Sequence, residues 1–208
     1  MTPPRLHFLF PFLNRIKLHG RANKINTCQA DVKYCEIHIR GRNNVFKCES
    51  LFKHGGVLIK GDNNEITIGR GGELRNLRLW IVGNNCRIHL GDSIIFNGGR
   101  VVCAGENNYV SIGDRCMFAE GIEIWASDTH PVFKDGKTIN PSRPVVIGQH
   151  VWLGTNVMVL KGTVIKEGAI VGMGSLVKGL VPSRSMAVGN PAHVVKTDVD
   201  WDKSTIDC

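Results

Sequence analysis

A six-residue repeat in the second half of the chain constrains its fold more than any other feature. From Ile147 to Pro182 the sequence divides into the hexads IGQHVW, LGTNVM, VLKGTV, IKEGAI, VGMGSL and VKGLVP. Each hexad begins with an aliphatic residue, and the fifth place of the first five holds a small or aliphatic one. An amphipathic helix repeats every 3.6 residues and a half-buried strand every 2, so neither produces this pattern. A period of six indicates short strands joined by turns in a regular solenoid.

A longer repeat precedes the hexads. A glycine with an asparagine one to three positions after it returns at spacings of 21, 20, 22 and 22 residues, beginning at Gly20, Gly41, Gly61, Gly83 and Gly105. A unit of this length fits one solenoid coil, with three short strands joined by three turns. Glycine and asparagine supply the positive φ values that tight corners require. The aliphatic residues of each coil are buried against the coils above and below it.

The two repeats together predict an all-β protein with a parallel β-solenoid over residues 19–196. Residues 1–18 are expected to form an apolar cap over one end of the core. Residues 197–208 form a short C-terminal tail, in which 197–206 are expected to make a short helix. The handedness of the coils does not follow from the repeat, because general rules favour right-handed connections between parallel strands.

The charge balance favours an anionic partner. Lys and Arg number 26 against 18 Asp and Glu, which gives a net charge of +8 and a pI near 9.3. Such a surface attracts phosphorylated or acidic small molecules and anionic polymers. No run of basic residues with interleaved aromatics is present, so the sequence argues against a nucleic-acid partner.

Cysteine usage and hydropathy favour a cytoplasmic protein. The seven cysteines are odd in number and show no Cys-x-x-Cys spacing, which is typical of buried free thiols in a reducing compartment. No segment is long enough to cross a membrane. The apolar stretch 6–13 is interrupted by Pro11 and lacks the charged start and cleavage site of a signal peptide. We therefore expect no stable insertion into a membrane.

The solenoid pattern is interrupted once, at residues 126–144. This segment, ASDTHPVFKDGKTINPSRP, is polar and contains three prolines and one glycine. A long loop that projects from a rigid scaffold is a usual place for catalytic residues. It contains His130, and an imidazole, which titrates near neutrality, is suited to take a proton from a reacting hydroxyl. A single surface histidine usually has no such role, so the case for His130 depends on the motifs around it.

Three motifs resemble those of the hexapeptide-repeat O-acetyltransferases. They are Ser-Asp-Thr-His-Pro at 127–131, Val-Ile-Gly-Gln-His-Val-Trp-Leu-Gly at 146–154, and Ala-Val-Gly-Asn-Pro-Ala-His-Val-Val-Lys at 187–196. Galactoside and maltose acetyltransferases share this framework. The Asp-x-His-Pro loop followed by Trp-Leu-Gly looks closest to enzymes that act on capsular or other surface saccharides, including sialic acid. The specific match covers about residues 105–196, and before that the likeness rests on the repeat alone.

The resemblance implies a left-handed parallel β-helix, a homotrimer with active sites between subunits, and acetyl-CoA as cosubstrate without a metal. It implies that His130 is the general base that activates a saccharide hydroxyl. Asp128 either orients the imidazole or caps the loop turn, and the turn is slightly favoured. Trp152 either lines the acceptor and acetyl region or packs at a coil corner, and Asn97 matches an acceptor-binding asparagine.

The resemblance also implies a binding path for acetyl-CoA between subunits. Small or backbone-exposing residues along the pantetheine arm are followed by cations and a proline near the nucleotide; they are Gly154, Thr155, Gly172, Met173, Lys178, Arg184, Pro191, His193 and Lys196. Met173 departs from the small residue common at its position, and His193 stands where relatives often carry arginine. A backbone N–H of Gly154 or Thr155 is expected to bind the acetyl oxyanion.

Three alternatives remain open on the sequence. N-acetylation of an amino sugar or sugar nucleotide needs the same base. A γ-type carbonic anhydrase needs two histidines five positions apart, and no pair among the eight histidines has that spacing. A non-catalytic β-solenoid has no use for His130. The absence of a serine or cysteine nucleophile motif favours direct attack over an acyl-enzyme, and His150, inside the hexads, is expected to face solvent without a catalytic role.

Overall fold

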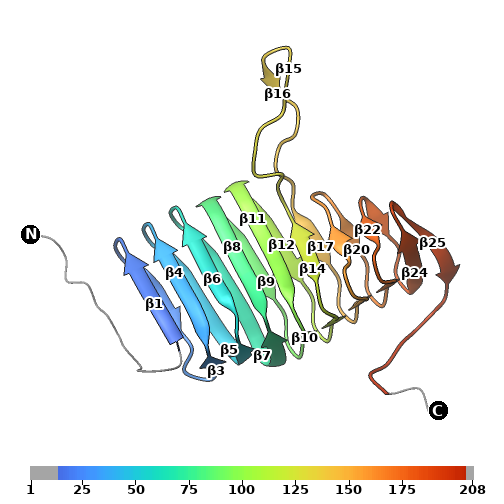
Figure 1. Ribbon diagram of the computed structural model, residues 1–208, viewed down its shortest axis with the longest axis horizontal. Coiled ribbons are helices and arrows are strands. Elements are labelled where there is room, and N and C mark those ends of the chain that lie inside the picture. Colours follow the sequence, from blue (N-terminus) through green and yellow to red (C-terminus); the bar gives the residue numbers. More distant parts are fainter. Residues whose placement is uncertain (1–13, 205–208) are drawn as a thin grey trace, which may run out of the picture.

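The computed structural model describes residues 14–204, which form a three-sided prism of stacked β-strands (Figure 1). All pairing along the prism is parallel apart from the last strand, and the described residues contain no helix. Every coil runs through three faces, which we call first, second and third in chain order. The predicted all-β parallel solenoid is therefore confirmed.

The first face is a single parallel sheet. Its strands are β1 (Asn14–His19), β4 (Cys35–Arg40), β6 (Gly56–Lys60), β8 (Leu77–Asn84), β11 (Gly99–Glu106), β14 (Ile122–Trp125), β19 (Met158–Val159) and β22 (Leu176–Val177). The second face comprises β2 (Lys24–Asn26), the first halves of β5 (Val45–Lys53) and β7 (Glu65–Arg75), β9 (Arg87–Leu90), β12 (Tyr109–Ile112), β17 (Val145–Ile147), β20 (Val164–Ile165) and β23 (Leu180–Val181).

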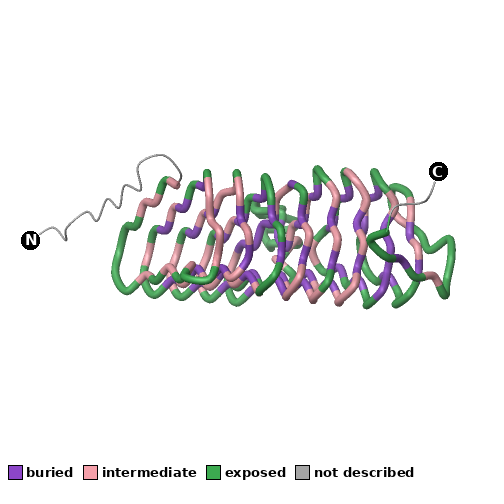
Figure 2. The backbone as a smooth tube through the Cα atoms, turned by 90° about the horizontal axis from the view of Figure 1, so that it is seen from below, coloured by how far each residue is buried: buried purple, intermediate pink, exposed green. Residues whose placement is uncertain are grey.

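The third face holds the remaining strands of the prism. They are β3 (Asp31–Lys33), the second halves of β5 and β7, β10 (Ile95–Phe96), β13 (Met117–Phe118), β18 (Trp152–Leu153), β21 (Ile170–Val171), β24 (Ser185–Gly189) and the antiparallel β25 (Ala192–Thr197). Strand residues alternate between the inside and the surface, so that buried and exposed segments follow each other along each coil (Figure 2). The core is aliphatic, with a few large rings at its centre: Phe46, Phe52, Phe96 and Phe118.

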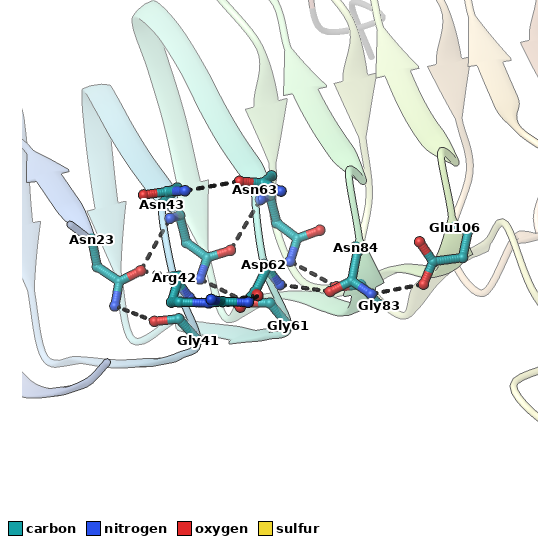
Figure 3. A network of polar contacts seen from close by, with 12 residues as sticks. Asn23, Gly41, Arg42, Asn43, Gly61, Asp62, Asn63, Gly83, Asn84 and Glu106 are labelled. Atoms are coloured by element: carbon teal, nitrogen blue, oxygen red, sulfur yellow. Dashed lines mark hydrogen bonds and ion pairs between the residues drawn. The ribbon is translucent and has the colours of Figure 1, made fainter. Parts of the chain in front are cut away.

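Glycines and asparagines build the first corner, between the first and second faces. Gly41, Gly61 and Gly83 all have positive φ, and a Cβ on Gly61 would lie 1.8 Å from the carbonyl oxygen of Gly83. Asn44 and Asn64 are buried beside them, and each side-chain amide donates at 2.8 Å to the glycine carbonyl of the next coil. Asn23 makes the equivalent bond to the Gly41 carbonyl at 2.9 Å (Figure 3). The regular spacing of glycines in the sequence therefore arises because the backbone of each coil stacks directly on the backbone of the next.

The loop 126–144 takes the place of the first corner in one coil. Val110 pairs with Val145 across it, so the register of the second face continues undisturbed. Its neck is closed where Arg143 N–H and the Asn108 side chain both donate to the carbonyl of Ala126, at 3.1 and 3.0 Å. The tip is the small hairpin of β15 (Phe133–Lys134) and β16 (Lys137–Thr138), which stands away from the prism (Figure 1). The predicted projecting loop is confirmed.

The two ends of the chain differ in part from the sequence expectation. β1 already pairs with β4, so the residues from Asn14 onward belong to the solenoid, before the expected boundary at residue 19. The rest of the expected cap, residues 1–13, lies outside the described residues. The short helix expected from residue 197 is wrong for 197–204, because β25 continues to Thr197 and no helix follows as far as Ser204.

Most of the described cysteines lie in the core of the solenoid. Of the six in the described part of the chain, all are free; Cys28 is exposed and the others, Cys35, Cys48, Cys86, Cys103 and Cys116, are buried. Burial raises the pKa of the Cys48 thiol to about 11 and that of Cys116 to about 12, which keeps both thiols protonated at neutral pH. Within residues 14–204 there is no helix with the length and hydropathy needed to cross a membrane.

The glycine stacking gives a first prediction. Gly61→Ala should lower the free energy of unfolding by about 3 kcal/mol or more, because positive φ strain of about 1–2 kcal/mol adds to the overlap with Gly83. Gly136→Ala is the matched control, since Gly136 also has positive φ but has no atom within 4 Å of its Cβ position. Urea unfolding at one protein concentration measures both. Equal losses in the two variants would show that stacking is not the cause.

Candidate functional site

Asp128 anchors the loop to the solenoid. Its carboxylate oxygen Oδ2 accepts hydrogen bonds from the ammonium of Lys161, on the next coil, and from the side chain of Asn140 at 2.8 Å. Lys161 also donates to the carbonyl of Asn140 at 3.0 Å. The Lys161 ammonium, followed by the Asn140 amide, holds the pKa of Asp128 below its usual 3.8. Asp128 therefore joins both arms of the loop to the corner beneath them.

The same network fixes the backbone of His130 and leaves its ring outside. The N–H of His130 donates to the Asp128 carbonyl at 2.7 Å, and Asn140 donates to the His130 carbonyl at 2.9 Å. Thr129, between the two, has a positive φ of 63°. Within residues 14–204 the Asp128 carboxylate makes no hydrogen bond to the imidazole, which is exposed. The Asp128 carboxylate thus contacts the other arm of the loop and the next coil, and its two expected roles, orienting the imidazole or capping the loop turn, stay predictions.

The third corner, between the third face and the next first face, brings several expected site residues into line. Asn97, Gly154 and Gly172 occupy equivalent places in their coils, and the N–H of each donates to the carbonyl one coil further on. Thr155 and Met173 follow in the same row, where Gly174 N–H bonds the Thr155 carbonyl at 2.8 Å. Met173 is 77% exposed. We call this line the third-corner row.

Close packing requires the glycines of the third-corner row. A Cβ on Gly154 would lie 2.8 Å from the Met173 nitrogen, and one on Gly172 would lie 2.7 Å from a methyl of Val188. Of the two expected oxyanion donors, the Gly154 N–H is already bonded to the Val171 carbonyl at 2.8 Å. The N–H of Thr155 has no acceptor in the described part of the chain, which leaves it as the donor that can bind a ligand.

The expected cations do not gather at one place. Pro191 and His193 lie where β24 turns into β25, at the end of the third-corner row, and His193 pairs with Val188. Lys196 lies further along β25, opposite Met186 on the third face. Lys178 stands at the first corner and Arg184 at the second, between the second and third faces. All of these side chains are exposed.

Trp152 is covered by a residue that the sequence did not single out. Trp152 lies half-buried on β18, and its ring centroid is 6.0 Å from that of Trp201 in the C-terminal tail. Trp201 stacks on His150 at 4.4 Å and donates its indole N–H to the His150 carbonyl at 3.0 Å. Asp200 lies 3.1 Å from the His150 ring nitrogen. His150 is thus half-covered rather than solvent-facing, which corrects the sequence expectation.

One copy of the chain does not assemble these parts into one pocket. His130 projects from the first corner, whereas the row with Gly154 lies at the third corner and Trp152 on the third face. The strands β14, β19 and β22 of the first face lie between the two corners. The loop also points away from the prism rather than across that face (Figure 1).

Comparison with known proteins agrees with this arrangement of coils and loop. Residues 144–179 match the family model of the bacterial transferase hexapeptide, six repeats. A polysialic acid O-acetyltransferase of Neisseria meningitidis is 30% identical over 148 residues, which are 59% of this chain and 68% of that protein. The chain belongs to the hexapeptide-repeat O-acetyltransferases.

Further relatives lie in the same family. A polysialic acid O-acetyltransferase of Escherichia coli O1:K1 / APEC is 33% identical over 170 residues, 81% of this chain. The chain spans 44% of the length of that relative. The crystal structure of the polySia specific acetyltransferase NeuO superposes with a TM-score of 0.78, at 29% identity over 93% of this chain and 89% of the other. That of the polysialic acid O-acetyltransferase OatWY gives 0.73, at 26% identity over 93% and 92%.

The match to NeuO confirms the left-handed β-helix that the resemblance implied. No group of three or more His, Cys, Asp or Glu side chains is placed to hold a metal ion within residues 14–204.

The loop anchor gives a second prediction. Lys161→Met should return the pKa of Asp128 toward 3.8 and speed tryptic cleavage after Lys134 and Lys137 about two- to fivefold, the effect of a solvent-screened ion pair. In the parent, a lowered carboxyl pKa means that the anchor is present above pH 3.8 and is lost as pH falls through the lowered value. NMR titration of the carboxyl and timed proteolysis measure these effects.

Lys166→Met is the matched control, because Lys166 is exposed and makes no ion pair in the described residues. A Lys161 variant with unchanged Asp128 titration would contradict the assigned anchor.

Proposed function

We propose that this protein transfers an acetyl group from acetyl-CoA to a hydroxyl of an acidic surface or capsular saccharide of the sialic acid type. The observation that carries the proposal is His130, exposed on a loop whose backbone is bonded on both sides of it. The names of the two polysialic acid O-acetyltransferases at 30% and 33% identity support the acceptor class. Because acetyl-CoA is the donor, the reaction belongs in the cytoplasm.

The proposed mechanism is a direct transfer. His130 accepts the proton of the saccharide hydroxyl while that oxygen forms a bond to the thioester carbonyl carbon. The Thr155 N–H stabilises the negative charge that develops on the carbonyl oxygen. When the carbon–sulfur bond breaks, the protonated imidazole returns the proton to the thiolate, so atoms and charge balance without a metal or covalent intermediate.

The geometry supports a site completed by two copies of the chain. A loop that leaves one prism at the first corner is positioned to meet the third-corner row and Trp152 of a neighbouring prism. Exposed aliphatic side chains continue down the first corner and its flanking faces below the loop; they are Met158, Leu160, Val164 and Leu180. Such a patch is suited to burial against a second copy, and three copies around one axis close the assembly as a homotrimer.

In this arrangement the donor follows the third-corner row. Gly154, Thr155, Gly172 and Met173 present backbone and small groups to the pantetheine arm. Pro191, His193 and Lys196 at the end of the row then face the nucleotide and its phosphates, and Asn97 at the other end faces the acceptor. Lys178, at the first corner, joins from the copy that supplies His130. Arg184, at the second corner, lies on neither edge and is not part of the proposed site.

The third prediction concerns the base. His130→Ala should lower kcat about 10²- to 10⁴-fold, the usual contribution of a general base, without lowering stability, because the ring is exposed. Thiol release and mass spectrometry of the product, with hydroxyl and amino sugars side by side, measure transfer and its target. His89→Ala, on the second face, is the control. Undiminished transfer by the His130 variant would overturn the mechanism, and transfer to amines alone would favour N-acetylation.

The fourth prediction concerns the shared site. His130→Ala and Trp152→Ala are each expected to be inactive alone, while mixed trimers should recover about a third of the parental activity, because one of the three interfaces in every mixed trimer carries both intact residues. The mixed oligomers are purified with two different tags before assay. Mixed oligomers with no more activity than the single variants would place His130 and Trp152 in the same copy or in unrelated sites.

A further inference from the structure

A hollow of about 340 Å³ lies on the first face, away from the catalytic loop. It spans β4, β6 and β8, which are neighbouring strands in Figure 1. Its lining combines an aromatic ring with basic, acidic and neutral polar groups; it includes Glu36, His38, His54, Gly56, Arg78 and Trp80. Nothing in the proposed transfer uses these residues.

The fold does not require the glycine at the floor of this hollow. Gly56 pairs with Glu36 and Arg78, whose side chains point outward, so a side chain at 56 would also point outward. Its Cβ would come no closer than 3.7 Å to any atom. At Gly61, by contrast, a Cβ would overlap the backbone at 1.8 Å. The stacking explains Gly61, whereas at Gly56 the absence of a side chain keeps the hollow open.

A rigid aromatic wall runs from the hollow to the base of the loop. The guanidinium of Arg100 lies over the rings of Trp80 and Trp125, at 5.0 and 5.1 Å from their centroids. Glu123 accepts from Arg100 at 3.0 and 3.1 Å and from the Trp125 indole at 2.7 Å. Trp125 ends β14 directly before the loop. Since strands are about 4.8 Å apart, Trp80 lies about 10 Å along the face from Trp125.

The charges around the hollow favour an anion. Arg78 is exposed at the rim of the hollow and has no acidic partner among residues 14–204. The one acidic residue of the lining, Glu36, is shared between Arg15 and Lys17 at 3.9 Å. The Nε2 atom of His38 is buried and has no hydrogen-bond partner in this part of the chain. An unpaired guanidinium beside a fixed indole offers bidentate contact to a carboxylate and an apolar surface to a ring.

We propose that this hollow is a second saccharide subsite, which binds an acidic sugar residue of the same acceptor chain some residues away from the one acetylated at His130. The wall of Trp80, Arg100 and Trp125 then supports the chain between the two points. This inference rests on the proposed function for the identity of the chain. It adds that affinity depends on acceptor length, because the base of the loop at β14 and the hollow at β6 lie three strands, about 14 Å, apart along the face.

The test measures binding separately from chemistry. The His130→Ala protein, which does not turn over, is titrated calorimetrically with an α-linked sialic acid dimer and with a long oligomer. In that background Gly56→Leu fills the hollow, while Trp80→Ala and Arg78→Ala remove its walls. Each should lower the ratio of long-oligomer to dimer affinity about tenfold. Arg87→Ala on the second face, where the arginine is also exposed and has no acidic partner within residues 14–204, should leave the ratio unchanged.

The outcomes separate this inference from the proposed function. Thermal unfolding first checks that Gly56→Leu is folded, as its free Cβ position predicts. Length-dependent binding that Gly56→Leu abolishes, in a parent that transfers no acetyl group, keeps the subsite and rejects the function. Acetyl transfer with a ratio unaffected by Gly56→Leu, Trp80→Ala and Arg78→Ala rejects the subsite and keeps the function. Failure of the long oligomer to bind at all also rejects the subsite.

Discussion

Backbone stacking at the first corner is the constraint on which the rest of this molecule depends. The carbonyl oxygen of Gly83 occupies the position that a Cβ of Gly61 would take, and the same holds from Gly20 to Gly83. With no side chain between them, successive coils approach to the strand spacing of about 4.8 Å. Asn44 and Asn64 then span the gap with their amides. Because each coil buries its aliphatic residues against its neighbours alone, an error at this corner exposes core on both sides.

The loop 126–144 is compatible with this constraint because it replaces a corner and leaves the strands in register. Asn108 ends the row of asparagines by bonding both the Ala104 and the Ala126 carbonyls at 3.0 Å. The chain then leaves the prism and returns to pair Val145 with Val110. Lys161, one coil further on, holds Asp128 and Asn140 from below. The rigidity of the solenoid is thereby passed to the backbone of His130, and the proposed role as a base needs such alignment with the substrate.

The sequence predicted the coils well because they follow its six-residue repeat, and it predicted the loop well because the loop interrupts that repeat. Gly154 and Gly172 are three hexads apart, which is one full turn and therefore the same corner. The same rule corrects the expected cation cluster, since Lys178 and Arg184 differ by one hexad and must lie on successive corners. Residues one hexad apart are near each other along the prism axis but lie on different corners of the prism.

No repeat or motif in the sequence predicted the position of Trp201. It sits beyond the repeats, and its stacking on His150 is a contact between residues 51 positions apart that no local pattern records. The tail was expected to be helical because helical propensity is local, but tertiary burial of one indole decides its path. The Asp128–Lys161 pair could be predicted in part. Aligning the corners coil by coil places Lys161 under the loop, but composition alone does not identify the pair.

A straight prism also determines how its site can be assembled. It has no hinge that would bring the first and third corners together, so in the proposed trimer the groups on different corners meet through a second copy. The first face then remains as an uninterrupted surface beneath the loop, and Trp125 lies at the end of that surface, directly before the loop. An enzyme that grips a long acceptor needs such a surface more than it needs a deep pocket, because each sugar residue bound along it adds affinity without changing the reacting one. The repeat that builds the core thus also extends the binding surface, one coil at a time.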